Sequence, residues 1–189
     1  MGVLGLMKEK PILFNTDMVK AILEGRKTQT RRIVKEKDIM SKWDGVEGGH
    51  ILASCPYGQG DRLWVRETWY PVPEHKPVSR TTNYPKVWYK ANNDKPTWGG
   101  SIWKPSIFMP RKYSRITLKI TGVEVERVQD INQTVHDEVL REGWPFGYSQ
   151  HENISPVKLF ERIWDSINGK KYPWSDNPWV WVISFKKVD

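Results

Sequence analysis

The segment WVWVISFKKV (179–188) constrains the fold of this chain more than any other. Apolar side chains occupy both alternating faces of its first seven residues. A strand that is apolar on both faces has to be covered on both sides, so the segment predicts a central strand in the core. Trp179 and Trp181 are then expected in the core. Trp164, from an apolar stripe that precedes the strand, is expected there too.

Three short helices are predicted, at about 16–24, at about 134–142 and from Ser155-Pro156 onward. Each begins at a residue that can cap a helix N-terminus and shows apolar residues at helical spacing. Each also ends at a glycine, which tolerates the left-handed conformation that follows many helices. These glycines are Gly25, Gly143 and Gly169.

Several segments predict strands. TQTRRIV (28–34) is rich in β-branched residues, and RLWVRETWY (62–70) alternates so that Leu63, Val65, Glu67 and Trp69 share one face. SRITLKITGVEVERV (114–128) changes phase at Thr121-Gly122, which predicts two strands joined by a turn or bulge. Residues 41–60 are rich in glycine and predict a loop with a short strand.

The order of these elements predicts an α+β fold. Strands and helices do not alternate as in βαβ units, which favours a small mixed sheet or barrel in a single domain, residues 1–189. A stretch at about 71–112 holds seven prolines and the segment VWYKA, so we expect a long surface insertion that contains one strand.

Charge and tryptophan content favour a nucleic-acid partner. The chain carries a formal net charge of +8 and eleven tryptophans, a combination suited to a polyanion with flat faces. The single cysteine, Cys55, excludes an internal disulfide and favours the cytoplasm. No apolar run approaches the length of a membrane span, and the histidines show no metal-site spacing. We therefore expect a monomer with no membrane contact, metal or cofactor.

The segment GRKTQTRR (25–32) packs four cations and two hydroxyls behind the first predicted helix. Helix-GRKTQTRR resembles the GxKxxxxR element of the ASCH domain, a PUA-like β-barrel family. GDRLWVRETW resembles the next strand of that family, and ITGVEVERVQDI with the later REGW resembles its final portion. The similarity covers about residues 11–189 and is greatest to the longer ASCH proteins of phages and prophages, which share a stretch like MPRKYSRITL.

The resemblance implies a PUA-like mixed barrel whose cleft binds RNA or a modified nucleoside. Compact catalytic members of the family are amidohydrolases that act on acetylated cytidine with a Lys, a Thr and a Glu. Those residues correspond to Lys27, Thr30 and Glu142, with Glu138 as an alternative for the last. Lys27 and Thr30 would lie on opposite faces of a regular strand, so they share a cleft only if the chain is still turning after Gly25. Thr28 is otherwise the rival hydroxyl.

Basic and aromatic residues near this element form a candidate nucleic-acid surface. Glu67 is included because a carboxylate on an inward face requires a partner, such as Arg32 or the edge of a base. Trp64 and Trp69 lie on opposite faces of one strand, so at most one of them can line a cleft. The candidates are Arg26, Arg31, Arg32, Trp64, Arg66, Glu67, Trp69, Arg111, Lys112 and Arg115.

Three functions remain open from the sequence. The favoured one is a nucleic-acid-binding protein, for RNA in preference to DNA, with a cleft for a single and sometimes modified base. The first alternative is an amidohydrolase that removes an acyl group from 4-acylated cytidine. The second is a non-catalytic phage assembly or host-interaction protein.

Overall fold

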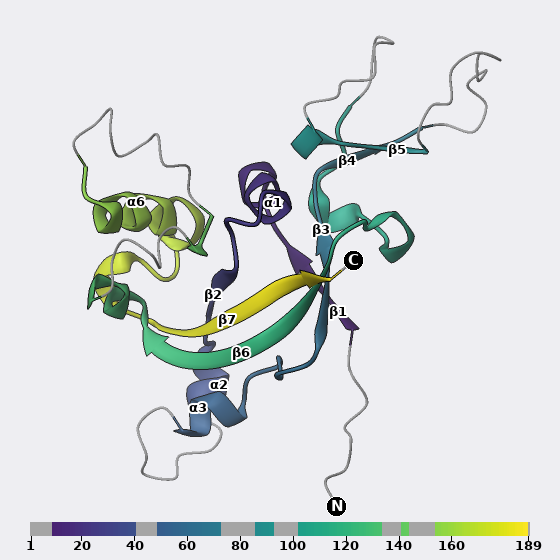
Figure 1. The fold of residues 1–189 in the computed structure, drawn as a ribbon. Coiled ribbons are helices and arrows are strands. Elements are labelled where there is room, and N and C mark those ends of the chain that lie inside the picture. The colour runs from purple at the N-terminus through teal and green to yellow at the C-terminus, as the bar shows by residue number, and fades with distance from the viewer. Residues whose placement is uncertain are drawn as a thin grey trace, which may run out of the picture.

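The computed structural model describes residues 9–40, 49–72, 86–92, 102–133, 141–143 and 154–188 (Figure 1). The α-helices are α1 (Thr16–Leu23), α2 (Glu36–Met40), α3 (Gly49–Ala53) and α6 (Pro156–Asn168). The strands are β1 (Glu9–Leu13), β2 (Gln29–Ile33), β3 (Arg62–Arg66), β4 (Trp69–Pro71), β5 (Val87–Tyr89), β6 (Thr117–Arg127) and β7 (Trp179–Val188). Short 3-10 turns lie at Lys90–Asn92, Ser106–Phe108, Arg111–Tyr113, Val128–Gln133 and Trp174–Asp176.

Five strands form one mixed, curved sheet in the order β1-β3-β6-β7-β2 (Figure 1). The β1–β3 pair is parallel and the other three pairs are antiparallel. The α+β class with a mixed sheet is therefore confirmed. Among the described strands the sheet is open, with β1 and β2 as its edges. The helix α1, which joins these two edges in the sequence, packs Val19 and Ile22 into the core.

The expected central strand is β7, which pairs with β6 on one side and β2 on the other. Its alternate residues enter two different clusters of the core. Val180 and Val182 pack with Phe160 and Trp164 of α6, whereas Trp181, Ile183 and Phe185 pack with α1, β1 and β3. The prediction that both faces are covered is thus confirmed. Trp164 and Trp181 are buried, while Trp179 is only partly buried.

The strand β6 differs from the prediction in one respect. Residues 117–127 form one strand of 11 residues and not two strands joined at Thr121-Gly122. The phase change in the sequence is nevertheless real, because the register against β7 shifts between Ile120 and Gly122. A bulge accommodates one extra residue and bends the strand without ending it. Of the two structures expected here, a turn or a bulge, the bulge is confirmed and the turn is excluded.

Two other strand and loop predictions were wrong in part. The single strand expected at 62–70 is broken after Arg66, and Trp69 begins the separate β4–β5 pair. Residues 49–53 form the helix α3 where a loop and a short strand were expected; residues 41–48 lie outside the described residues. The strand expected inside the insertion is confirmed as β5.

Side-chain caps explain where the helices α1 and α6 begin. The Asn15 side chain accepts a hydrogen bond from the backbone N–H of Met18 at the start of α1, and Ser155 accepts one from Lys158 at the start of α6. Such caps satisfy backbone donors that have no partner within the helix. Of the helix expected at 134–142, residues 134–140 lie outside the described residues. Residues 141–143 are described, and they end at Gly143 with φ of 90°.

Candidate functional site

A buried lysine lies at the centre of the candidate site. The Lys27 side chain follows the turn after α1 and is shielded from solvent, with only 2% of the residue exposed. Its Nζ donates hydrogen bonds to the carbonyl oxygens of Gln29 (2.8 Å) and Glu142 (2.7 Å) and to Oε2 of Glu142 (2.9 Å). All three donors of a lysine ammonium therefore have acceptors.

An arginine completes the charge balance around Glu142. Arg31 Nη1 donates to Oε1 of Glu142 at 3.1 Å, and Arg31 Nε donates to Oε1 of Glu126 at 2.7 Å. Arg31 and Glu142 are both buried, so the two cations and the Glu142 carboxylate form a desolvated cluster, with the partly exposed Glu126 at its edge. Buried charges of this kind are tolerated only when they are paired and hydrogen-bonded.

Backbone contacts hold the segment 141–143 against the turn that follows α1. Thr28 N–H donates to the carbonyl of Arg141 at 2.9 Å, and Arg26 Nη1 donates to the carbonyl of Gly143 at 3.1 Å. A Cβ placed on Gly143 would lie 2.8 Å from Cβ of both Ala21 and Lys27. The close approach therefore requires glycine, and it is what brings Glu142 to Lys27.

The electrostatic environment makes the Lys27 ammonium easier to deprotonate. Burial lowers the pKa of Lys27 below its ordinary value, and the Glu142 carboxylate opposes this effect. The nearby cations Arg31 and Arg32 also lower the pKa of Lys27. A lysine shifted in this direction is a better proton donor and, once neutral, a base or nucleophile.

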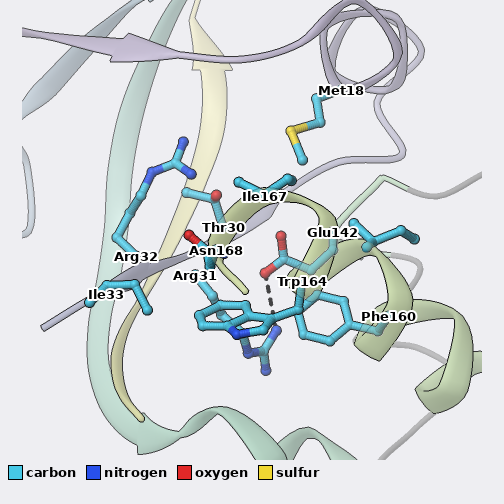
Figure 2. Close-up of a pocket in the computed structure, with 11 residues that line it drawn as sticks. Met18, Thr30, Arg31, Arg32, Ile33, Glu142, Phe160, Trp164, Ile167 and Asn168 are labelled. Carbon is cyan, nitrogen blue, oxygen red and sulfur yellow. Dashed lines mark hydrogen bonds and ion pairs between the residues drawn. The ribbon is translucent and has the colours of Figure 1, made fainter. Parts of the chain in front are cut away.

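A pocket opens beside this cluster between β2, α1 and α6 (Figure 2). Its polar lining comes from Thr30, Arg31, Arg32, Glu142 and Asn168, and α6 also supplies Phe160 and Trp164. Its volume is about 80 Å³. One water needs about 10 to 15 Å³ of space measured in this way, so the pocket holds several waters. A ligand of nucleoside size can place only an edge here unless the lining moves.

A wider groove adjoins the pocket. It has a volume of about 570 Å³, and its lining shares Ile33 and Asn168 with that of the pocket. The groove continues past the end of β2 to Lys35 and Lys37 and past the end of α6 to Lys171. The polar pocket and the groove therefore meet at Ile33 and Asn168.

The structure brings Lys27, Thr30 and Glu142 together at one site. Lys27 precedes β2, and its backbone N–H still bonds to Ala21, so the chain is turning after Gly25, but Lys27 does not itself line the pocket. Thr30 is buried and lines the pocket, whereas Thr28 is exposed. Glu142 contacts Lys27 directly, while Glu138 lies outside the described residues.

The candidate arginines take part in pairs within the protein. Arg26 Nε donates to Glu24 at 2.8 Å, and Arg111 Nη2 to Glu9 at 2.8 Å. Arg32 Nη2 donates to the carbonyl of Leu13, and its guanidinium lies over the Phe14 ring. Of the arginines in the candidate surface, Arg31 and Arg32 line the pocket.

Glu67 has a partner, but it is Arg115 and not Arg32. The carboxylate is buried, and Arg115 Nε and Nη2 donate to its two oxygens at 2.9 Å and 3.0 Å. Burial raises the pKa of Glu67, and the Arg115 guanidinium opposes the rise. The same guanidinium lies 4.0 Å from the centroid of the Tyr89 ring, so this pair joins the region after β3 to the insertion.

The remaining candidates lie away from the pocket. Trp69 is buried in a separate cluster with Val87 and Met109. Trp64 is partly exposed, and the guanidiniums of Arg66 and Arg111 lie 5.4 Å and 5.9 Å from its ring centroid. Lys112 lies over the Tyr113 ring. Neither Trp64 nor Trp69 belongs to the lining of the pocket.

Two further observations concern the described part of the chain. It contains no group of three His, Cys, Asp or Glu side chains placed to hold a metal ion. None of its helices is both long enough and apolar enough to cross a membrane.

Sequence reasoning missed the three lysines of the groove and the role of α6. Phe160 and Trp164 were expected only in the core, yet each also presents an edge to the pocket. Lys35 and Lys37 follow β2 directly, so their proximity in sequence to GRKTQTRR could have indicated that they lie near the site. Nothing in the sequence placed Lys171 near them, because Lys171 lies 134 positions after Lys37.

Comparison with known proteins gives weak structural likenesses. The sequence matches no family model and no curated protein. Protein EF3133 from Enterococcus faecalis V583, of family DUF984, matches with a TM-score of 0.46 and 11% identity over 97% of this chain and 78% of that one. Hypothetical protein PH0355 matches with a TM-score of 0.41 and 12% identity over 96% of this chain and all of that one.

A third solved structure is an ASCH domain. It comes from Lactobacillus crispatus JV V101 and matches with a TM-score of 0.40 and 14% identity over 95% of this chain and 79% of that one. All three TM-scores are below 0.5, so none of these likenesses supports a function. The resemblance to the longer phage proteins stays a prediction.

Proposed function

We propose that this protein binds the polar edge of a nucleobase, in RNA or in a modified nucleoside, in the pocket of Thr30, Arg31 and Glu142. The observation that supports the proposal is the convergence of these three polar side chains, with Arg32 and Asn168, in a pocket whose other lining residues are apolar or aromatic. Small-molecule sites typically combine such a lining with a few placed polar groups.

The hydrogen-bonding capacity of Glu142 suits the amino edge of a base. Each of its oxygens accepts one bond from within the described residues, from Lys27 and from Arg31. An ionised carboxylate has about four acceptor positions, so two remain for a ligand N–H. The Thr30 hydroxyl can donate or accept. The rings of Phe160 and Trp164 offer aromatic surface to the base.

Thr30→Val tests this proposal because valine keeps the shape of threonine and removes the hydroxyl. Loss of one buried hydrogen bond costs about 1 to 1.5 kcal/mol, so the affinity for cytidine or 4-acetylcytidine should fall about tenfold. The measurement is calorimetric titration at neutral pH. Thr28→Val, at the exposed neighbouring hydroxyl, is the matched control and should bind as the wild type does. Equal affinity of all three proteins would contradict the proposal.

Hydrolysis of a 4-acylated cytidine is the second candidate function. The hydrogen bond from Lys27 to Glu142, whose side chain lines the pocket together with Thr30, favours it. Water, positioned by Thr30, would add to the acyl carbon and pass its proton to neutral Lys27. The amide C–N bond would then break as its nitrogen is protonated with help from Glu142, giving cytidine and a carboxylate. Arg31 and Arg32 would stabilise the oxyanion.

Release of cytidine from 4-acetylcytidine by the purified chain tests this second candidate. Base catalysis by a positioned side chain contributes roughly a hundredfold to ten-thousandfold to such a rate. No release from any of several acylated cytidines would exclude the hydrolytic function and leave the binding function in place.

A further inference from the structure

The groove beside the pocket carries an excess of positive charge. Its lining contains Lys35, Lys37 and Lys171 against one carboxylate, Glu36. All three lysines are exposed. The Tyr172 side chain and, to a smaller extent, Glu36 raise the pKa of Lys171, so this group is fully charged at neutral pH.

The arginines favoured by the sequence are less suited to binding a polyanion. Arg31 pairs with Glu126 and Glu142, Arg111 with Glu9, and Arg115 with Glu67. A phosphate that approached any of them would have to compete with a carboxylate already in place. The lysines of the groove lie instead along a depression of about 570 Å³, where a ligand has room.

The groove and the pocket are joined in a way that fits a nucleotide. Ile33 and Asn168 line both of them, so a ligand whose base edge reaches Thr30 has its remaining bulk directed past these two residues. Beyond them lie the lysines and Tyr172. Lysine ammonium groups bind phosphate as compact point charges, and a tyrosine ring can stack on a sugar or base.

We propose that Lys35, Lys37 and Lys171 bind the phosphate groups of the nucleic acid or nucleotide whose base edge occupies the adjoining pocket. This inference rests on the proposed binding function and adds a site to it. The phosphate has two sources, a mononucleotide or the backbone of an RNA strand, and they share this chemistry. The charge excess of the groove supports either source.

A purely structural explanation of these lysines makes a different prediction. Lys171 follows the C-terminus of α6, where a cation interacts favourably with the helix dipole, and exposed lysines also promote solubility. In that case removing them changes stability slightly and leaves ligand binding untouched.

The experiment compares three proteins: the wild type, the double variant Lys35→Gln with Lys171→Gln, and the control Lys119→Gln with Lys186→Gln. The control removes two exposed lysines that pair across β6 and β7, away from the lining of the groove. Affinities for cytidine, cytidine 5′-monophosphate and a short single-stranded RNA are measured at salt concentrations from low to above physiological. Melting temperatures check that all variants are folded.

For the RNA strand, the slope of log affinity against log salt should become shallower in the groove variant. The expected change is about 0.7 for each phosphate that the variant no longer neutralises. The control should keep the wild-type slope, and cytidine should bind all three proteins equally. If the monophosphate already binds more tightly than cytidine and this gain disappears in the groove variant, a mononucleotide phosphate suffices. If only the strand shows the gain, the partner is the RNA backbone.

Unchanged slopes and affinities in the groove variant would overturn the inference while cytidine binding continues to support the pocket. Absence of cytidine binding in the wild type would instead count against the proposed function. In that case, salt-dependent RNA binding that disappears in the groove variant would still locate the phosphate site. No binding of cytidine, monophosphate or RNA would overturn both.

Discussion

Replacing Lys27 with methionine is expected to lower any hydrolysis of 4-acetylcytidine by at least about a hundredfold and to reduce the free energy of unfolding by about 3 kcal/mol. The first effect follows if Lys27 is the base. The second follows because Glu142 would remain buried without the ammonium that lies 2.9 Å from its Oε2. Arg31 still contacts Glu142, so the loss in the free energy of unfolding should lie at the lower end of the range for a broken buried ion pair.

Changing the charge of Glu142 tests whether the loss of stability arises from its buried carboxylate. Without Lys27 the ionised Glu142 side chain stays buried beside one cation fewer, which destabilises the folded state. The deficit of Lys27→Met should therefore become smaller when the carboxylate is replaced by a neutral amide, as measured by urea unfolding.

A second substitution separates lost charge balance from lost packing. Lys27→Met with Glu142→Gln should be more stable at neutral pH than Lys27→Met alone, because no uncompensated charge remains at that position. Lys112→Met, at an exposed lysine, is the control and should change the free energy of unfolding by no more than about 0.5 kcal/mol. A deficit that is not reduced by Glu142→Gln would contradict this account.

The substitution Gly143→Ala should reduce the free energy of unfolding by about 2 to 4 kcal/mol, since backbone strain and overpacking each cost about 1 to 3 kcal/mol. Gly143 has φ of 90°, and a Cβ there would lie 2.8 Å from Cβ of Ala21 and of Lys27. Because the strain falls on the residue after Glu142, ligand binding should weaken as well. Thermal and denaturant unfolding measure the first effect, and calorimetry measures the second.

Gly25 provides a matched control for the backbone contribution. It also has a positive φ, 74°, but a Cβ there would meet no atom within 4 Å. Gly25→Ala should therefore cost only about 1 kcal/mol and leave binding intact. Ala21→Gly added to Gly143→Ala should recover part of the loss, since it removes one of the crowded atoms. Equal costs for Gly143→Ala and Gly25→Ala would show that the close approach of 141–143 is unimportant.

Much of the fold could be predicted because local signals agreed with the tertiary contacts. Asn15 and Ser155 cap the helices as expected, and the apolar faces of β7 meet two separate clusters. The strand β1 was missed because EKPIL contains a proline, which argues against a central strand. Proline is tolerated there because β1 is an edge of the sheet.

The candidate site was predictable only as far as the resemblance reached. It selected Lys27, Thr30 and Glu142, which the structure places together, although Arg31 and Glu142 are 111 positions apart in the sequence. Charge counting could not tell which cations are already neutralised. Arg31 and Arg115 read as a basic track in the sequence, but their carboxylate partners Glu126 and Glu67 lie 95 and 48 positions away.

The most direct measurement of the central claim uses the indole N–H resonance of Trp164. This group lines the pocket, and its Nε1–H donates to the carbonyl of Tyr172, so a base in the pocket must alter its surroundings. A ¹H–¹⁵N titration with cytidine and 4-acetylcytidine, with the peak assigned through Trp164→Phe, reports it in a single spectrum. Trp69, in the separate cluster with Val87, is the internal reference.

The account predicts that the Trp164 indole resonance shifts with ligand concentration to saturation, while that of Trp69 stays in place. Thr30→Val should move the midpoint of the titration to about tenfold higher ligand concentration. A saturating shift at Trp69 with no change at Trp164 would show that the ligand binds elsewhere and would contradict the assignment of the pocket.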